Sequence, residues 1–217
     1  MSFELPSLYA IINVDSHPAP IDFAALLFRS GVSLLQLRNK TLARSEFAEI
    51  AIAVRRIQKQ SSFDLHSTLL INDDIDVCLS SGAHGIHLGQ EDTSVEKARE
   101  ILGKDAVIGL STHNEIELDA CPLSLLSYVA AGPVFLSGTK SGHAPILGVE
   151  TLCRMTKRSP LPLVAIGGIT EENAKEVFGA GAASVAVIAA LANSNDLKRT
   201  IAAFQNAASA LNRFKRS

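Results

Sequence analysis

The chain alternates short apolar runs with segments of helical period, and it does so about eight times. Residues 8–14 and 163–166 are continuous apolar runs of strand length. A strand that is apolar on both faces is typical of a parallel sheet covered by helices. The pattern therefore predicts successive βα units, and eight such units close a parallel barrel with the helices outside.

The expected elements follow one another without a linker or a break in composition. The predicted strands are residues 8–14, 33–38, 69–72, 85–88, 107–110, 126–130, 163–166 and 184–188. The predicted helices are residues 21–29, 43–60, 75–81, 95–102, 115–121, one that begins near Val149 after a long connection, 170–178 and 196–212. Thr93 and Glu96 form a capping-box pattern before the fourth helix.

The alternative fold for such alternation is an open, doubly wound sheet with a ligand at one switch point. The chain lacks a GxGxxG motif after its first strand, and polar residues follow nearly every predicted strand. A barrel uses all its βα loops at one rim, which fits this spread. We therefore predict a single (β/α)8 TIM barrel over residues 1–217, with its core at about 7–212.

Composition excludes several classes of protein. The 47% hydrophobic content supports a substantial core, and the net charge of −2 argues against broad capture of nucleic acid or an anionic membrane. Neither a signal peptide nor a membrane span is recognisable, which predicts a cytoplasmic protein. The odd number of cysteines (Cys78, Cys121 and Cys153) and their spacing suggest buried small hydrophobes rather than disulfides or a metal site.

Charged and amide side chains follow the second, third and fourth predicted strands. Gln36, Arg38 and Lys40 alternate at the end of the second strand, and a guanidinium beside an ammonium suits a pyrophosphate. Asn72 and Asp73 end the third strand, and Asp92 follows the fourth. Carboxylates above neighbouring strand ends can share one Mg²⁺, with water and a substrate phosphate as its other ligands. We therefore expect a site for Mg²⁺ and a phosphorylated small molecule.

The later strand ends add further candidates. Ser111 can donate to a phosphate oxygen or a ring nitrogen, and His113 is an acid, a base or a simple donor. The long sixth connection, which contains Lys140, suggests a phosphate clamp on a mobile flap. The Gly167–Gly168 pair lies where barrels often hold a phosphate with backbone N–H groups.

Several motifs in order resemble those of the thiamine phosphate synthase family over residues 8–191. They are Gln36-Leu-Arg-x-Lys40, Ile71-Asn-Asp73, residues 85–92, residues 109–113, residues 132–135, Thr139-Lys140 and residues 165–169. The resemblance implies an enzyme that joins hydroxymethylpyrimidine diphosphate to a thiazole phosphate and releases pyrophosphate. It also implies ionisation of the pyrimidine–diphosphate bond and capture of the resulting cation by the thiazole nitrogen.

The resemblance assigns roles to individual residues. The diphosphate side comprises Gln36, Leu37, Arg38, Asn39, Lys40, Asn72, Ser111 and Lys140, with Asp73 and Asp92 on Mg²⁺. Catalytic roles are implied for Arg38, Lys40, Ser111 and Lys140. The thiazole phosphate side comprises Ser137, Gly138, Thr139, Gly167, Gly168, Ile188 and Ala189, and His113 is a further substrate-binding candidate. On the diphosphate side, Asn39 replaces a usual Glu of the family. On the thiazole side, Leu136-Ser-Gly138 replaces a usual Pro-Thr turn and Ala189 a usual Ser, so this side departs most from the family pattern.

Two alternatives stay open at this point. A thiazole tautomerase of the same family would use His113 as a proton shuttle, but the histidine is shared by both branches. A non-catalytic regulator that binds thiamine intermediates is the other alternative. The retained Asp92 and diphosphate residues favour the synthase. A homo-oligomer is neither indicated nor excluded.

Overall fold

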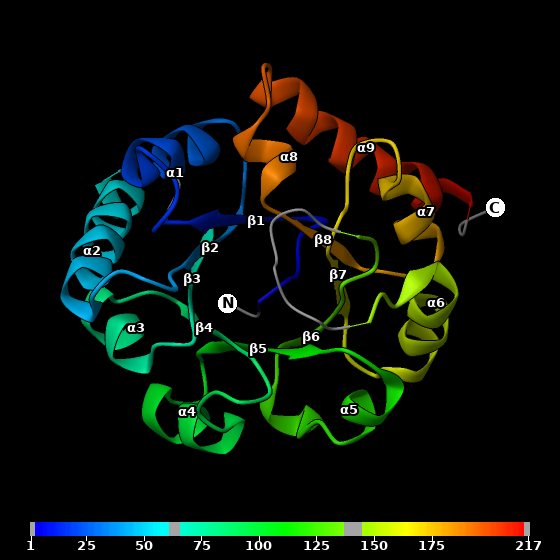
Figure 1. Ribbon diagram of the computed structural model, residues 1–217, viewed down its shortest axis with the longest axis horizontal. Helices are drawn as coiled ribbons and strands as arrows, with labels where there is room; N and C mark the ends of the chain where they lie inside the picture. Colours follow the sequence, from blue (N-terminus) through cyan, green and yellow to red (C-terminus); the bar gives the residue numbers. More distant parts are fainter. Residues whose placement is uncertain (1–2, 61–65, 137–144, 215–217) are drawn as a thin grey trace.

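The computed structural model describes residues 3–60, 66–136 and 145–214, with side chains described up to residue 210. Eight parallel strands pair in sequence order, and β8 pairs with β1 to close the barrel. Helices surround the barrel on all sides (Figure 1). The predicted (β/α)8 barrel is therefore confirmed.

The elements agree closely with the predicted ranges. The strands are β1 (Leu8–Asn13), β2 (Leu34–Arg38), β3 (Thr68–Asn72), β4 (Gly85–Leu88), β5 (Val107–Thr112), β6 (Tyr128–Ala131), β7 (Leu163–Ile166) and β8 (Ser184–Val187). The helices are α1 (Pro20–Arg29), α2 (Arg44–Gln60), α3 (Ile75–Ser81), α4 (Val95–Leu102), α5 (Glu115–Asp119), the 3-10 turn η2 (Leu123–Leu125), α6 (Gly148–Arg158), α7 (Ala174–Gly179), α8 (Ala189–Ala192) and α9 (Leu197–Phe214).

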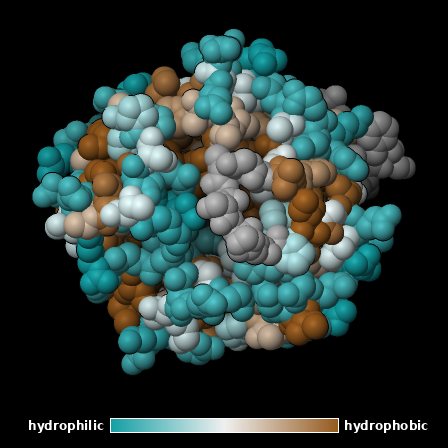
Figure 2. Space-filling view, viewed as in Figure 1, coloured by the Kyte–Doolittle hydropathy of each residue, from teal (hydrophilic) through white to brown (hydrophobic). Residues whose placement is uncertain are grey.

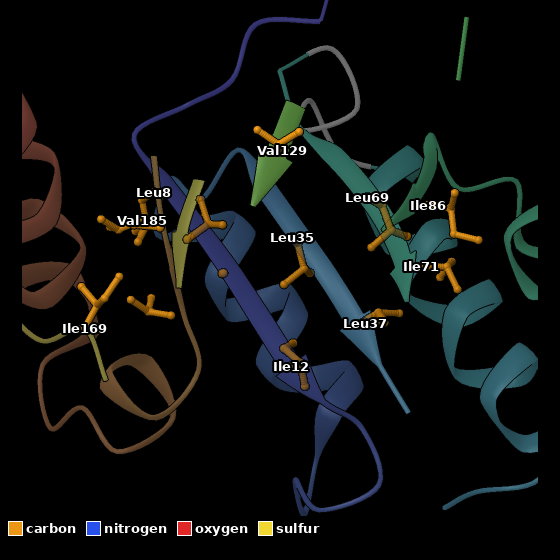
Figure 3. Close-up of a cluster of buried hydrophobic side chains, with 14 of the residues drawn as sticks. Leu8, Ile12, Leu35, Leu37, Leu69, Ile71, Ile86, Val129, Ile169 and Val185 are labelled. Carbon is orange, nitrogen blue, oxygen red and sulfur yellow. The ribbon is translucent and has the colours of Figure 1, made fainter. Parts of the chain in front are cut away.

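Alternate residues of each strand face two different apolar layers. Leu35 and Leu37 of β2 belong to the large cluster between the sheet and the helices, as do Leu69 and Ile71 of β3 (Figure 3). Leu34 of β2 belongs to the smaller cluster inside the barrel. Burial on both sides removes the need for polar alternation, which explains the continuous apolar runs in the sequence.

Some local predictions were wrong. Helix α4 is capped by Ser94, whose Oγ accepts from the N–H of Lys97 at 3.3 Å, and not by Thr93. The helix after β7 begins at Ala174 rather than Thr170, because the side chain of Asn173 accepts from the Thr170 N–H and forms a turn. The turn η2 and helix α8 were not predicted, since three or four residues carry too little periodicity. Of the cysteines, Cys78 is buried but Cys121 and Cys153 are only half-buried.

One close approach inside the barrel depends on a glycine. A Cβ atom at Gly109 of β5 would lie 2.1 Å from Cζ of Tyr128 on the neighbouring strand β6. A missing side chain at this position therefore makes room for the tyrosine ring to cross the barrel interior. Across the described part of the chain, no helix is long and apolar enough to cross a membrane.

Candidate active site

The carboxyl ends of β2 and β3 bring two cationic side chains to one side of the barrel mouth. At the end of β2, Nη1 of Arg38 donates to Oδ1 of Asn13 at 3.1 Å. Just past that strand, Nζ of Lys40 lies 2.7 Å from Oδ2 of Asp73, which follows β3. The backbone N–H of Lys40 donates to Asp15 at 3.0 Å, so neighbouring loops fix the position of this residue.

Asp73 and Asp92 form a carboxyl pair beside Lys40. Burial and a hydrogen bond with Asp92 together raise the pKa of Asp73 to about 6, against the lowering effect of the Lys40 ammonium. Asp73 also has a φ of 63°, a left-handed conformation that is uncommon for a residue with a side chain. Oδ2 of Asp92 accepts from the N–H of Gly89 at 2.7 Å. The pair was predicted as a metal site, and the structure does bring the two carboxyls into contact.

The donor set of this pair fits Mg²⁺. Two neighbouring carboxyls offer the oxygen ligands that a small divalent cation prefers. Within residues 3–60, 66–136 and 145–210, no group of three or more His, Cys, Asp or Glu side chains could hold a metal ion. Magnesium commonly takes one or two protein carboxylates and completes its shell with water and substrate phosphate.

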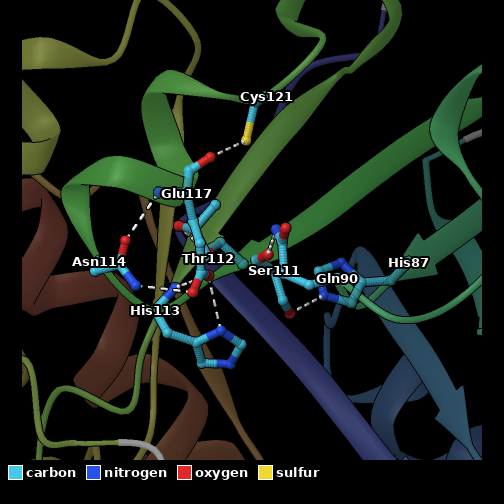
Figure 4. A network of polar contacts seen from close by, with 9 residues as sticks. His87, Gln90, Ser111, Thr112, His113, Asn114, Glu117 and Cys121 are labelled. Atoms are coloured by element: carbon cyan, nitrogen blue, oxygen red, sulfur yellow. Dashed lines mark hydrogen bonds and ion pairs between the residues drawn. The ribbon is translucent and has the colours of Figure 1, made fainter.

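The predicted residues Gln36, Asn72 and Ser111 lie at the floor of the same mouth. With Arg38 and His87 they line a small cavity of about 40 Å³. The Oγ atom of Ser111 lies 2.9 Å from Nε2 of His87 (Figure 4). The side chain of Gln90 donates to the backbone oxygen of Ser111 at 2.6 Å, which fixes the end of β5.

Two predicted substrate-binding side chains, those of Leu37 and Asn39, are engaged by the protein itself. Leu37 is fully buried between the sheet and the helices, so its side chain packs in the core. The side-chain oxygen of Asn39 accepts from the N–H groups of Thr41 and Leu42, and it shapes the loop after β2. An amide therefore stabilises the loop at the position where the family usually has a carboxylate.

His113 is held by the helix that follows it. Its Nδ1 atom lies 2.9 Å from Oε2 of Glu117, and its backbone N–H donates to the same oxygen at 2.7 Å. Asn114 caps α5 and also contacts Glu117, so the carboxylate organises the whole turn (Figure 4). Among the described contacts, the imidazole of His113 binds Glu117, whereas Ser111 binds His87.

The carboxyl ends of β7 and β8 form a second, less polar cavity of about 540 Å³. Gly167 and Gly168 have φ values of 100° and 64°, and a Cβ at Gly168 would lie 2.5 Å from the backbone oxygen of Leu136. The cavity is lined by Pro133, Leu136, Ile166–Thr170, Ala186–Ala190 and Asn193. None of these lining residues is cationic, so an anion here would be held by N–H and hydroxyl dipoles.

The two sides of the mouth differ in surface character. Polar side chains predominate over the ends of β2 to β4, whereas apolar atoms reach the surface on the β6–β7 side (Figure 2). On that side Leu136 is 84% exposed and Ile146 is 52% exposed. The predicted residues Ser137, Gly138, Thr139 and Lys140 come between them in sequence and lie outside the described residues.

Sequence reasoning missed the aromatic part of the site. The chain has two tyrosines, Tyr9 and Tyr128, and both lie fully buried inside the barrel. His87 of β4 links Tyr128 to Ser111. The available signal was a tyrosine within an apolar strand, because a buried phenol needs a polar partner.

Known proteins are similar to this chain in sequence and in fold. The family model described as thiamine monophosphate synthase matches residues 8–191. A thiamine-phosphate synthase of Koribacter versatilis is 41% identical over 194 residues, which cover 87% of this chain and 90% of that protein. A thiamine-phosphate synthase of Leptospira biflexa is 43% identical over 180 residues, which cover 81% of this chain and 84% of that protein.

A solved structure shows the same fold. The thiamine phosphate pyrophosphorylase from Pyrococcus furiosus superposes with a TM-score of 0.82 at 28% identity, covering 94% of this chain and 96% of that one. The family match spans most of the chain and includes both sides of the barrel mouth described above. The chain therefore belongs to the thiamine monophosphate synthase family.

Proposed function

We propose that this chain is a thiamine phosphate synthase, a transferase that couples hydroxymethylpyrimidine diphosphate with a thiazole phosphate and releases pyrophosphate. One observation carries the proposal beyond family membership. A charged cluster at the ends of β2 to β4 and a glycine-lined cavity at the ends of β7 and β8 open at the same barrel mouth. Two anionic substrates can therefore meet above the strand ends.

The charged cluster holds the pyrimidine diphosphate. Arg38 and Lys40 contact the diphosphate, and Gln36, Asn72 and Ser111 hold the pyrimidine and its first phosphate at the floor of the mouth. Asp73 and Asp92 hold Mg²⁺, and their contact supports this role. When bound, Mg²⁺ neutralises negative charge on the diphosphate oxygens.

The reaction begins with loss of the diphosphate. The bond between the pyrimidine methylene carbon and the diphosphate oxygen breaks, and both electrons leave with pyrophosphate. Arg38 and Lys40 stabilise the developing negative charge, and the buried floor excludes water from the cation. The thiazole nitrogen then donates its lone pair to the methylene carbon and forms the new C–N bond. No nucleophile from the protein is required.

The less polar cavity holds the thiazole phosphate. Backbone N–H groups near Gly167, Gly168, Ile188 and Ala189 serve as donors, as in other barrels that bind phosphate between the last two βα loops. On the sixth connection, Ser137, Gly138 and Thr139 complete the thiazole phosphate site, and Lys140 contacts the diphosphate. A cytoplasmic location is part of the same proposal, since the substrates are small phosphorylated metabolites.

A coupling assay with both substrates and Mg²⁺ tests the function. We expect thiamine phosphate as product and a loss of about 100-fold or more in kcat/KM for Asp92→Ala, while the exposed neighbour Glu91→Ala serves as a matched control. Absence of product from the wild-type protein would refute the synthase. Isomerisation of a thiazole carboxylate that is lost in His113→Ala would instead indicate the tautomerase, and binding without turnover the regulator.

A further inference from the structure

Five side chains from five strands form a continuous series of hydrogen bonds through the barrel interior. The side-chain nitrogen of Gln36 donates to the hydroxyl of Tyr9. The Tyr9 hydroxyl lies 3.0 Å from that of Tyr128, which lies 2.9 Å from Nδ1 of His87. Nε2 of His87 lies 2.9 Å from Oγ of Ser111. The series joins two residues at the floor of the diphosphate side.

The direction of these hydrogen bonds follows from the Gln36 amide, whose nitrogen faces the Tyr9 hydroxyl. Among the described residues, the Tyr9 hydroxyl contacts Gln36 and Tyr128, and because Gln36 donates, the proton of Tyr9 goes to Tyr128. The Tyr128 hydroxyl accepts from Tyr9 and donates its own proton to Nδ1 of His87. Burial raises the pKa of both tyrosines, so both phenols keep these protons at neutral pH. A buried hydroxyl that donated elsewhere would lose a hydrogen bond.

The hydrogen bond between His87 and Ser111 runs in the same direction along the series. A neutral imidazole that accepts at Nδ1 carries its proton on Nε2, which donates to Oγ of Ser111. The hydroxyl proton of Ser111 is then left to point into the small cavity that Gln36 and Ser111 both line. At the other end, the nitrogen of the Gln36 amide is used by Tyr9, which leaves its carbonyl oxygen as the acceptor for a ligand.

Ring packing holds the series in place. The rings of Tyr9 and Tyr128 meet edge to face at 5.9 Å, and His87 stacks on Tyr128 at 5.7 Å with an interplanar angle of 14°. The absence of a side chain at Gly109 leaves space for Tyr128. Rotation of either tyrosine is therefore blocked, and the hydroxyl directions are set before a ligand binds.

We propose that Tyr9, Tyr128 and His87 are positioning residues that present Ser111 as a donor and Gln36 as an acceptor to the substrate heterocycle. This inference rests on the function proposed above. Ser111 as donor and Gln36 as acceptor together select a ring edge with an amino group beside an unprotonated nitrogen, as in an aminopyrimidine. The corresponding oxo compound carries a carbonyl beside an N–H group, which reverses donor and acceptor. Tyr9, Tyr128 and His87 thus set the direction of the two groups that discriminate between the compounds.

Binding without the thiazole substrate tests this inference. By calorimetry with Mg²⁺, we expect wild-type protein to prefer the aminopyrimidine diphosphate over its oxo analogue. Tyr128→Phe should reduce this preference about 10-fold and leave the affinity for inorganic pyrophosphate unchanged. Thr112→Val is the matched control, because it deletes a buried hydroxyl of the neighbouring strand β5 that donates to the backbone oxygen of Ala130 and is not part of the series. An unchanged preference in Tyr128→Phe, or an equal loss of pyrophosphate affinity, would overturn the proposal.

A second measurement covers the case in which Tyr128→Phe does not fold. Nitrogen-15 NMR of the wild-type protein reports which nitrogen of His87 carries the proton, and we expect Nε2. A proton on Nδ1 would refute the series as described. Both measurements are independent of turnover: a retained preference with no coupling would overturn the proposed function alone, whereas coupling without a preference would overturn this inference alone.

Discussion

Lys40 and Asp73 form an ion pair with a 2.7 Å distance between Nζ and Oδ2, and this pair connects the loop after β2 to the end of β3. Lys40 is 49% exposed at its side chain, whereas Asp73 is 23% exposed and contacts a second carboxyl, Asp92. The ammonium therefore offsets part of the repulsion between the two acids. A divalent cation would do the same more strongly.

We expect the stabilisation of the protein by Mg²⁺ to weaken as the pH falls below about 6. The folded pKa of Asp73 lies above its ordinary value, so without metal its contribution to stability is full below about pH 4 and is lost as the pH rises towards 6. Above about pH 6 the carboxylate is free to bind Mg²⁺, whereas at lower pH protons compete. Thermal unfolding with and without Mg²⁺, at about pH 5 and about pH 7.5, measures the difference.

The variant Asp73→Asn is the control for this pH dependence. It removes the titrating group, so the stabilisation by Mg²⁺ should be small at both pH values. A wild-type protein that gains the same stability from Mg²⁺ at both values would contradict the assignment of Asp73 to the metal.

Arg38→Ala should weaken the binding of inorganic pyrophosphate by about 10- to 100-fold, because a charged hydrogen-bond donor is lost from the mouth. Its contact with Asn13 shows that the guanidinium is positioned by the neighbouring strand. Arg56→Ala, on the exposed surface of α2, removes the same charge away from the mouth. Calorimetry in the presence of Mg²⁺ distinguishes the variants, and equal affinities for both would contradict the diphosphate site.

Ala189→Ser should increase the affinity for a thiazole phosphate by about 3- to 10-fold. Residue 189 is the first of α8 and lines the cavity between β7 and β8, where none of the lining residues supplies a cation. An added hydroxyl supplies one more hydrogen bond to the anion. The affinity for pyrophosphate should not change. Weaker phosphate binding would place the phosphate elsewhere in the mouth.

His113→Ala should lower kcat/KM of the coupling reaction by less than about 10-fold, because the imidazole is held by Glu117 and is not part of the Ser111 contacts. Glu117→Ala should cost about 1 kcal/mol of stability, since it removes the carboxylate that organises the start of α5. Steady-state kinetics and urea unfolding separate the two effects. A loss of activity comparable to that of Lys40→Ala would assign His113 a direct role.

Gly109→Ala should destabilise the protein by about 3 kcal/mol, since its Cβ would overlap the ring of Tyr128. Combining it with Tyr128→Leu, which removes the overlapping atoms, should recover part of the loss. A double-mutant cycle in urea measures this coupling. Simple additivity of the two changes would show that the ring moves aside.

The parallel sheet was predictable because burial on both faces leaves long apolar runs such as residues 8–14. The barrel was distinguished from an open sheet by the polar residues that follow nearly every strand. Asp73 and Asp92 were predictable as a pair because parallel strands end at one rim. The contacts of Asn39 and His113 were not, since either residue can face a ligand or the backbone at the same position in the sequence. Tyr9 and Tyr128 are 119 residues apart, and only the closure of the barrel brings them together.

The two sides of the mouth are built by different strands and stabilised by different contacts: ion pairs at the ends of β2 to β4, and close backbone packing at the ends of β7 and β8. Substitutions at distant sites without shared partners combine nearly additively. Each half can therefore acquire a new ligand while the other keeps its own. A barrel of this design can diversify one substrate at a time.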